Sequence, residues 1–575
     1  MINAFKNRIK AAKKEIPSDL VLRNAQVVNV FSGTIQEKDV AVYDGVIVGI
    51  GRGYTGTKET ELTGKTITPG LIDGHLHIES SMLTPSELAA ALAVHGTTTI
   101  VADPHEIANV MGLDGIRFML EDSASIPLDF FFMMPSCVPT THLETAGATL
   151  NAADLAVLKD HPRILGLAEV MNFPAVLAGE DGVLEKISLF RDKILDGHCP
   201  SLTGHDLQAY LTAGIRSDHE TSRLSEAFEK LENGMMLMIR EGSTAKNLEA
   251  LLPIITDRNA RRLCFVSDDL HAEDIQHRGH LDGVLRKAFS LGLDPVTAIQ
   301  LVTLNPAEYF ALKDRGAVAP GYNADLVVLD NLEDFSVNSV YKNGVLLKDS
   351  EKQIQFSEQH QTSSVQTGPF NMQPLTTRDL SIPYPGGKGR IMEMVSSQIF
   401  TRLVIEEIKS DNGFVVSDVE SDILKICVVE RHEASGRVGK GLVRGFGLKR
   451  GAMASSVAHD SHNVIAVGVS DEEIIAAVEA IRLMGGGLTV VSEGDIPVSV
   501  PLGIGGLMST HSMGPLVKQL KKIKQAALQL GCLAAEPFMA LSFLALPVVP
   551  ELKLTDRGLV DVNRFEIVPL FVDPG

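Results

Sequence analysis

The feature that most constrains this chain is a pair of histidines, His75 and His77, at the end of an apolar, β-rich run, PGLIDGHLH. Side chains at positions i and i+2 of a strand point to the same side, so both imidazoles can reach one metal ion. A single His-x-His pair is common by chance and is more often structural than functional. Its significance therefore depends on the residues that follow it along the chain.

Four further acidic or imidazole residues come later, each near the end of a segment with the composition of a β-strand. They are Glu169, His198, His219 and Asp268. In a barrel of parallel strands the carboxyl ends of all the strands meet at one face, so side chains at successive strand ends gather there. Each residue taken singly is more often an ordinary polar side chain, but the set predicts a metal centre at the mouth of a barrel.

The region between residues 70 and 312 alternates short apolar strands with helical stretches. The candidate strands are LIDGHLHI, TTTIVAD, DFFFMMPSC, ILGLAEV, KILDGHC, GIRSDHE, GMMLMIREG and LCFVSDD. Intervening segments such as PSELAAALAVHG have helical periodicity and end in glycine. Eight such alternations over about 250 residues predict a parallel (β/α)8 TIM barrel, of the α/β class, rather than an open sheet.

The barrel region is flanked by β-rich segments on both sides. Residues 1–69 have the pattern of an N-terminal surface helix followed by short strands, and residues 313–350 return to the strand pattern. Together these flanks predict one composite β-sandwich. Residues 351–384 are rich in Gln, Ser, Thr and Glu and predict a linker, whereas residues 385–575 predict a C-terminal α/β or α+β domain.

Composition and charge narrow the class of partner. The 575 residues are 45% hydrophobic and 22% charged, which is ordinary for a globular enzyme. The formal net charge is −20 and no dense block of Lys and Arg is present, so we expect no nucleic-acid partner. Five scattered cysteines without a C-x-x-C pair fit a reducing cytoplasm, and no segment has the pattern of a secretory signal or membrane span. We therefore expect a cytoplasmic protein, away from membranes, that acts on a small molecule.

The predicted ligands divide into two sets. His75, His77 and Asp268 would hold one divalent ion, the two later histidines would hold a second, and Glu169 would bridge both. Such ligands suit zinc, manganese and iron alike. Two ions about 3.5–4 Å apart can share one hydroxide and make it nucleophilic at neutral pH. The sequence thus predicts two divalent metal ions per chain.

Taken in order, these motifs resemble the amidohydrolase superfamily and, within it, the bacterial adenine deaminases. The resemblance rests on HLHIESSMLTP, VADPHEIANV, MPSCVP, GLAEVMNFPAV, DGHCPSLTG, SDHE and FVSDD, and on the extra C-terminal domain. It runs from about residue 20 to the end of the chain. Many members of the superfamily carry a carboxylated lysine on the fourth strand. This chain has Glu169 there, as adenine deaminases do, and its nearest lysine, Lys159, lies in a preceding helical stretch.

The resemblance implies hydrolysis of adenine to hypoxanthine and ammonia, a reaction of purine salvage and adenine catabolism. Hydroxide activated by the metals would attack C6 of the purine, and Asp268 would accept its proton and pass it to the departing amine. Glu220, next to His219, would either protonate the ring nitrogen beside C6 or orient that histidine. We expect Mn²⁺ or Fe²⁺, with Zn²⁺ as a further candidate, and a homo-oligomer, either a dimer or a tetramer.

Other polar residues near the predicted mouth are candidates for contact with the substrate. They are Asp103, His105, Glu106 and His271. The first three follow the second strand and could instead bind an additional metal or pack their loop, and His271 could be structural. Asp269 is expected to cap the helix that follows it. In the C-terminal region the polar run HDSHN, residues 459–463, is either a turn or a lid that reaches the barrel mouth.

Two alternatives remain open. Another hydrolase of the superfamily, acting on a cyclic amide or an N-acyl amino acid, would use the same metals, but such enzymes usually carry the lysine that this chain lacks. A non-catalytic binding or assembly protein on this scaffold would be expected to have lost ligands, whereas all six are present here. Fold alone does not decide the substrate, so adenine rests on the resemblance.

Overall fold

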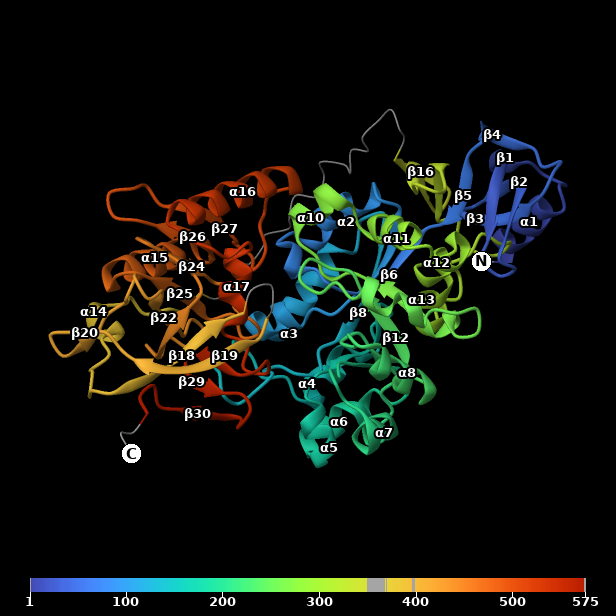
Figure 1. Cartoon of the computed structure of the whole chain (residues 1–575). Coiled ribbons are helices and arrows are strands. Elements are labelled where there is room, and N and C mark those ends of the chain that lie inside the picture. The colour runs from blue at the N-terminus through green and yellow to red at the C-terminus, as the bar shows by residue number, and fades with distance from the viewer. Residues whose placement is uncertain (1, 349–367, 369, 396–398, 573–575) are drawn as a thin grey trace.

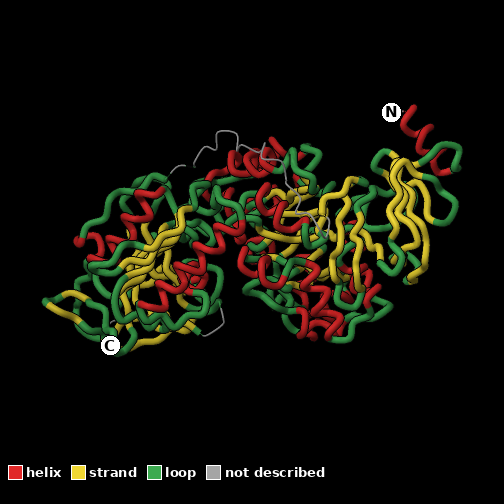
Figure 2. The backbone as a smooth tube through the Cα atoms, turned by 90° about the horizontal axis from the view of Figure 1, so that it is seen from above, coloured by secondary structure: helices red, strands yellow, loops and turns green. Residues whose placement is uncertain are grey.

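The computed structural model describes residues 2–348, 368, 370–395 and 399–572. Three units follow one another across the molecule: a β-rich N-terminal unit, a barrel, and a C-terminal domain on the other side of the barrel (Figures 1 and 2). Most of the predicted linker, residues 351–367 and 369, lies outside the described residues. Within the described part of the chain, no helix combines the length and apolar character that crossing a bilayer requires.

The central unit is a barrel of eight parallel strands whose order follows the chain. They are β6 (Leu71–His77), β7 (Thr97–Ala102), β8 (Asp129–Met134), β9 (Ile164–Val170), β10 (Ile194–Gly197), β11 (Ser217–Asp218), β12 (Met236–Arg240) and β13 (Leu263–Val266). The Arg216 amide donates to the Leu195 carbonyl at 3.1 Å, which joins β10 to β11. The two-residue strand β14 (Asp268–Asp269) follows β13 and pairs with β6, which closes the barrel. The predicted (β/α)8 barrel is confirmed.

Helices surround the barrel, and side chains fill its interior. The helices are α2 (Pro85–Ala93), α3 (His105–Asp122), α4 (Ala152–Lys159), α5 (Phe173–Ala178), α6 (Asp181–Leu189), α7 (Gly204–Thr212), α8 (Leu224–Glu232), α9 (Leu248–Leu251), α10 (Ala272–Arg278), α11 (Leu281–Ser290), α12 (Pro295–Leu301) and α13 (Leu304–Tyr309), with 3₁₀ turns at Glu79–Ser81, Leu252–Ile254 and Ala260–Arg262. Ile72, Val101, Met133 and Val266 project inward from different strands and pack with Phe310, which follows α13. A packed interior leaves the carboxyl ends of the strands as the place for a site.

The two flanks of the barrel form one eight-stranded sheet. Its strands are β1 (Ser18–Asn29), β2 (Thr34–Tyr43), β3 (Val46–Ile50), β4 (Gly56–Glu61), β5 (Thr66–Pro69), β15 (Leu326–Asn331), β16 (Ser336–Lys342) and β17 (Val345–Lys348). Strand β5 joins the two segments because it pairs with β1 on one side and with β15 on the other. The composite β unit is therefore confirmed, and helix α1 (Ile2–Ala12) packs on it.

The C-terminal domain is built on a second eight-stranded sheet. Its strands are β18 (Lys388–Met394), β19 (Thr401–Glu407), β22 (Ile423–Val429), β23 (Val438–Arg444), β24 (Ala452–Ser455), β25 (Val464–Gly468), β26 (Gly487–Val491) and β27 (Val498–Pro501). Smaller elements complete the domain: β20 (Ser410–Asp411), β21 (Phe414–Val415), β28 (Leu552–Thr555), β29 (Gly558–Asp561), β30 (Glu566–Val568), α14 (Thr377–Leu380), α15 (Asp471–Met484), α16 (Met513–Gln529) and α17 (Pro537–Phe543). Of the seven pairs of neighbouring strands in this sheet, only β18 with β23 is parallel, and the other six are antiparallel. The predicted α+β character is therefore confirmed.

The C-terminal domain packs against the barrel through buried polar contacts. The Thr140 hydroxyl donates to Asp460 Oδ2 at 2.6 Å, and the Asn463 side-chain amide donates to the Thr145 carbonyl at 2.8 Å. The Thr145 backbone amide donates in turn to Asp556 Oδ1 at 2.9 Å. Residues 459–463 thus lie in the loop between β24 and β25, directly on the barrel.

A buried ion cluster fixes the ends of β10 and β11. Lys230 Nζ, on α8, donates to Asp218 Oδ2 at 2.9 Å, to Glu226 Oε1 at 2.6 Å and to the Cys199 carbonyl at 2.8 Å. Asp218 also accepts from the Cys199 amide at 2.8 Å. Burial disfavours the charged lysine, but the two carboxylates outweigh that cost and raise the pKa of Lys230.

Replacing Lys230 with methionine should destabilise the barrel strongly. Two carboxylates would be left buried without a cation, which typically costs about 3–5 kcal/mol. Urea denaturation followed by far-UV circular dichroism measures the change. Lys246→Met, at an exposed position, is the control, and equal stability of the two variants would contradict the account.

Candidate metal centre

The structure brings together the six residues that the sequence singled out. They come from the carboxyl ends of five barrel strands: His75 and His77 on β6, Glu169 on β9, His198 after β10, His219 after β11, and Asp268 on β14. Five of them are buried, and His198 is 25% exposed at its side chain. Their assembly follows from the fold, since parallel strands in one barrel end at one face.

Glu169 lies between the two sets of predicted ligands. Its Oε1 is 3.4 Å from His77 Nε2, whereas its Oε2 is 2.7 Å from His198 Nδ1 and 3.1 Å from His219 Nε2. Asp268 Oδ1 lies 3.2 Å from His77 Nε2 and 3.5 Å from His75 Nε2. The Glu169 carboxylate therefore faces His77, of the first set, with one oxygen and both histidines of the second set with the other.

The protonation of the carboxylates follows from these neighbours. Burial alone would raise the pKa of Glu169, but the charge of His219 and the hydrogen bond from His198 hold it well below its usual range. Burial likewise opposes ionisation of Asp268, and the Arg240 guanidinium with the two β6 histidines reverses it, so that pKa is also well below its usual range. Both acids are thus ionised, as metal ligands must be.

The donor set fits divalent metal ions. Groups of these ligand atoms lie within 4.8 Å of one another, for example those of His75, His77 and Asp268. His75 Nε2 is buried and forms no hydrogen bond, although it faces this group. His77 Nδ1 lies 3.2 Å from the Asp103 carbonyl, which can only accept, so Nδ1 carries the proton and Nε2 is free to bind a metal.

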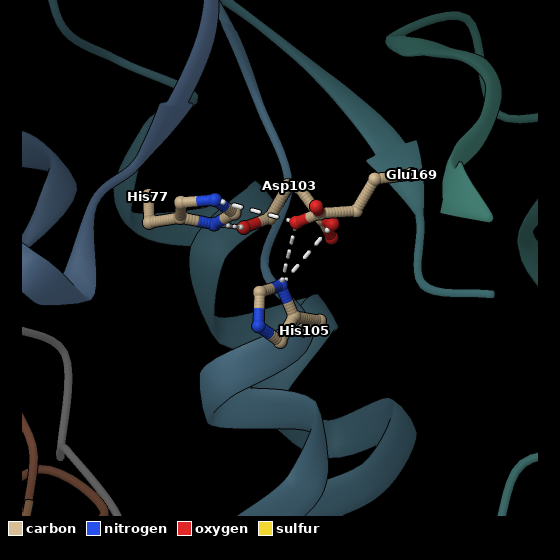
Figure 3. Close-up of side chains that lie close together, drawn as sticks. All are labelled: His77, Asp103, His105 and Glu169. Carbon is tan, nitrogen blue, oxygen red and sulfur yellow. Dashed lines mark hydrogen bonds and ion pairs between the residues drawn. The ribbon is translucent and has the colours of Figure 1, made fainter. Parts of the chain in front are cut away.

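Asp103 and His105 lie beside the predicted ligands (Figure 3). His105 Nδ1 is 3.2 Å from Asp103 Oδ2 and 3.5 Å from Glu169 Oε1. Ligand atoms of His77, Asp103, His105 and Glu169 form a further group within 4.8 Å. The loop after β7 and the first residue of α3 therefore add polar groups to the centre, whereas Glu106, the next residue of α3, faces the C-terminal domain.

Arg240 is a site residue that the sequence analysis missed. It ends β12, and its Nη1 donates to Asp268 Oδ2 at 2.8 Å while its Nη2 donates to Glu220 Oε2 at 2.9 Å. Glu220 Oε1 in turn lies 3.7 Å from both His198 Nδ1 and His219 Nε2. A charged residue closing an apolar strand, as in MMLMIR, is the signal that could have found it.

Two other predicted residues lie elsewhere. His271 lines a small cavity between the barrel and the C-terminal domain, together with Ser80 and Lys524. The prediction that Asp269 caps the next helix is wrong. Its carboxylate instead accepts from the Ser80 hydroxyl at 2.5 Å, because the pairing of β14 with β6 places it there. The N-cap position of α10 is His271, and no side chain caps this helix.

Comparisons with known proteins agree with this geometry. A family model described as the amidohydrolase family matches residues 66–347, and one described as the adenine deaminase C-terminal domain matches residues 398–566. The barrel and its ligand set thus place the chain in the class of amidohydrolases, a family that implies a divalent metal site.

Full-length relatives make the assignment narrower. A protein of Desulfatibacillum aliphaticivorans named adenine deaminase is 49% identical over 98% of this chain and 99% of its own length. Proteins of the same name from Dehalococcoides mccartyi (strain ATCC BAA-2266 / KCTC 15142 / 195) and Geobacillus kaustophilus (strain HTA426) are 48% and 44% identical, over 98% and 99% of this chain and 98% and 100% of their own lengths. The chain belongs to the adenine deaminase family, as the sequence motifs predicted.

Removing divalent metal should destabilise the protein, because ions that bind only the folded state stabilise it by mass action. At free metal 100 times the dissociation constant the gain is about 2.7 kcal/mol. Thermal unfolding of chelator-treated protein, with and without added Mn²⁺, measures the effect. His77→Ala should lose most of the stabilisation by Mn²⁺, and His511→Ala, at an exposed position, should retain that stabilisation. A metal-dependent shift that is the same in both variants would contradict the assignment of His77.

Proposed function

We infer that the protein hydrolyses adenine to hypoxanthine and ammonia. The observation that carries this conclusion is the buried, ionised Glu169 between the two histidine sets, in a chain that matches adenine deaminases along almost its full length. The rival hydrolases of cyclic amides or N-acyl amino acids are not favoured by these relatives. A non-catalytic scaffold is not favoured either, since all six predicted ligands are present and face one another.

The ligand assignment is part of the proposal. His75, His77 and Asp268 would hold one divalent ion, His198 and His219 would hold a second, and the Glu169 carboxylate between them would contact both. When bound, the ions lower the pKa of water and supply a nucleophile at neutral pH. Mn²⁺ or Fe²⁺ is expected, and Zn²⁺ also suits this donor set.

Asp268 is the proposed base. Its Oδ2 accepts from Arg240 at 2.8 Å, which holds the carboxylate ionised, and its Oδ1 faces the β6 histidines. It would take a proton from the attacking water as the C6–O bond forms, and deliver it to the exocyclic nitrogen as the C6–N bond breaks and ammonia leaves. The proposed base thus lies at the barrel mouth beside the residues that would hold the metal ions.

Glu220 has two roles that remain proposals: protonation of the ring nitrogen beside C6, or positioning of neighbouring side chains. Its two oxygens both accept from Arg240, which supports the positioning role. In that role it would orient Arg240, and through it Asp268, while facing the two histidines of the second set at 3.7 Å.

The direct test is ammonia release from adenine by protein stripped of metal and then reconstituted with Mn²⁺. We expect turnover only after reconstitution, and none with adenosine or cytosine. Cyclic amides and N-acyl amino acids form the other arms of the assay. Turnover of one of these in place of adenine would overturn the proposed substrate.

Asp268→Asn should keep its metals and lose turnover. Loss of a general base typically lowers kcat by about 10²–10⁴-fold. Metal analysis of the same preparation checks that the centre is intact. Asp274→Asn, on α10 and paired with Arg278, should behave as the wild type, and wild-type activity of Asp268→Asn would remove this residue from proton transfer.

Arg240→Met should move the acidic limb of the kcat/KM profile to higher pH. The guanidinium lowers the pKa of Asp268, so the wild-type base stays ionised until the pH falls well below the usual carboxyl range. Without that charge the pKa rises, and activity is lost earlier as the pH falls. Arg240→Lys should restore part of the difference, whereas an unmoved limb would contradict the role of Arg240.

Glu220→Gln separates the two roles of this residue. A lost proton donor lowers kcat by about 10²–10⁴-fold. A positioning residue whose glutamine replacement still accepts from Arg240 should cost less than about tenfold. We expect the smaller loss, measured beside Glu232→Gln, an exposed control on α8.

A further inference from the structure

A second cluster of ligand-type side chains lies where the C-terminal domain meets the barrel. Glu106, on the first turn of α3, faces His459 and His462 from the loop between β24 and β25. Glu106 Oε1 is 2.8 Å from His459 Nδ1, and its Oε2 contacts His462 Nε2. All three residues are buried, and their ligand atoms lie within 4.8 Å of one another. Helix α3 itself lies between the two units (Figure 1).

This cluster shares none of its members with the six residues of the barrel centre. His105 separates the two: its Nδ1 faces Asp103 and Glu169, and its Nε2 lies 3.5 Å from Glu106 Oε1. The histidines at the junction come from a different domain, about 190 residues along the chain from the last predicted ligand, Asp268. The junction is therefore a distinct set of donors.

Among the described residues, no lysine or arginine forms an ion pair with the carboxylates at the junction. Two further carboxylates come from neighbouring residues: Glu79 Oε1 accepts from the Ile107 amide, next to Glu106, and Asp269 accepts from Ser80, next to Glu79. In the described ranges, Glu106 forms ion pairs only with histidines, and neither Glu79 nor Asp269 forms one with a lysine or arginine. A cation would compensate these buried carboxylates.

A buried polar atom beside this cluster lacks a hydrogen-bond partner. Glu79 Oε1 accepts from the Ile107 amide at 3.0 Å, next to Glu106, but its Oε2 is buried and forms no hydrogen bond. The nearby Arg431 donates to the His462 and Gly505 carbonyls and not to a carboxylate. A buried polar atom without a hydrogen-bond partner is costly, and one explanation for such an atom is that an ion binds it.

We propose that Glu106, His459 and His462 form a separate binding site for a first-row divalent cation at the junction of the barrel and the C-terminal domain. Two imidazoles and one carboxylate are donors that zinc, manganese and iron accept. Ligands from both units would make the cation a cross-link that holds the loop of residues 459–463 against α3. This site is separate from the one proposed for deamination, because a cation would bind there without any of the six barrel ligands.

Zinc content measures this directly. Full-length protein is stripped with a chelator, reconstituted with excess Zn²⁺, desalted and analysed for zinc per chain by mass spectrometry. His459→Ala and His462→Ala should each hold about one zinc ion per chain fewer than the wild type. The same deficit should appear when either change is made in a His75→Ala/His77→Ala background, which weakens the barrel centre.

His511→Ala, an exposed histidine of the same domain, is the matched control and should keep the wild-type content. Far-UV circular dichroism and gel filtration check that each variant is folded. Equal zinc in the variants and the wild type would overturn the proposal and leave a hydrogen-bonded Glu–His–His contact. A loss of every bound ion would overturn the independence of the site. If the variants do not fold, anomalous diffraction from zinc-loaded wild-type crystals decides, since the proposal requires a peak between Glu106, His459 and His462.

Discussion

The arrangement of the site depends on one buried carboxylate, that of Glu169. A buried charge is costly unless it is compensated, and Glu169 is compensated by imidazoles that three other strands supply. One oxygen faces His77 and the other faces His198 and His219. These contacts form only when the barrel closes with its strands in the observed order. The geometry of the centre therefore depends on the topology of the fold. A divalent metal centre is the chemistry that such a ring of donors supports.

A second layer of charged side chains surrounds Asp268, the proposed base. Arg240 holds Asp268 on one side and Glu220 on the other, which joins the ends of β12, β14 and β11. Behind them, Lys230 fixes the Asp218 carboxylate next to His219. Arg240 is held by Asp268, itself a predicted ligand, and by Glu220, which follows His219, whereas Lys230 is held by Asp218, which precedes His219. The positions of the ligands are therefore set by buried ion pairs as well as by the strands.

The sequence was sufficient for the barrel and for the six candidate ligands, because both depend on local patterns. Strand ends are visible in apolar runs, and parallel strands in a barrel bring their ends together whatever lies between them. Arg240 was missed because its importance comes from two partners, Glu220 and Asp268, that only the folded chain brings to it. Glu106 was named as a candidate, but its two histidine partners were not paired with it because they lie about 350 residues away along the chain. Asp269 was assigned to the wrong partner because a cap is a local prediction, whereas the pairing of β14 with β6 is not.

The central claim is that the six residues at the barrel mouth hold two divalent ions. The most direct measurement is anomalous X-ray diffraction at the manganese edge from crystals of Mn²⁺-loaded protein. The account predicts two anomalous peaks about 3.5–4 Å apart, one beside His75, His77 and Asp268, the other beside His198 and His219, with Glu169 between them. A single peak, or none among these residues, would contradict it.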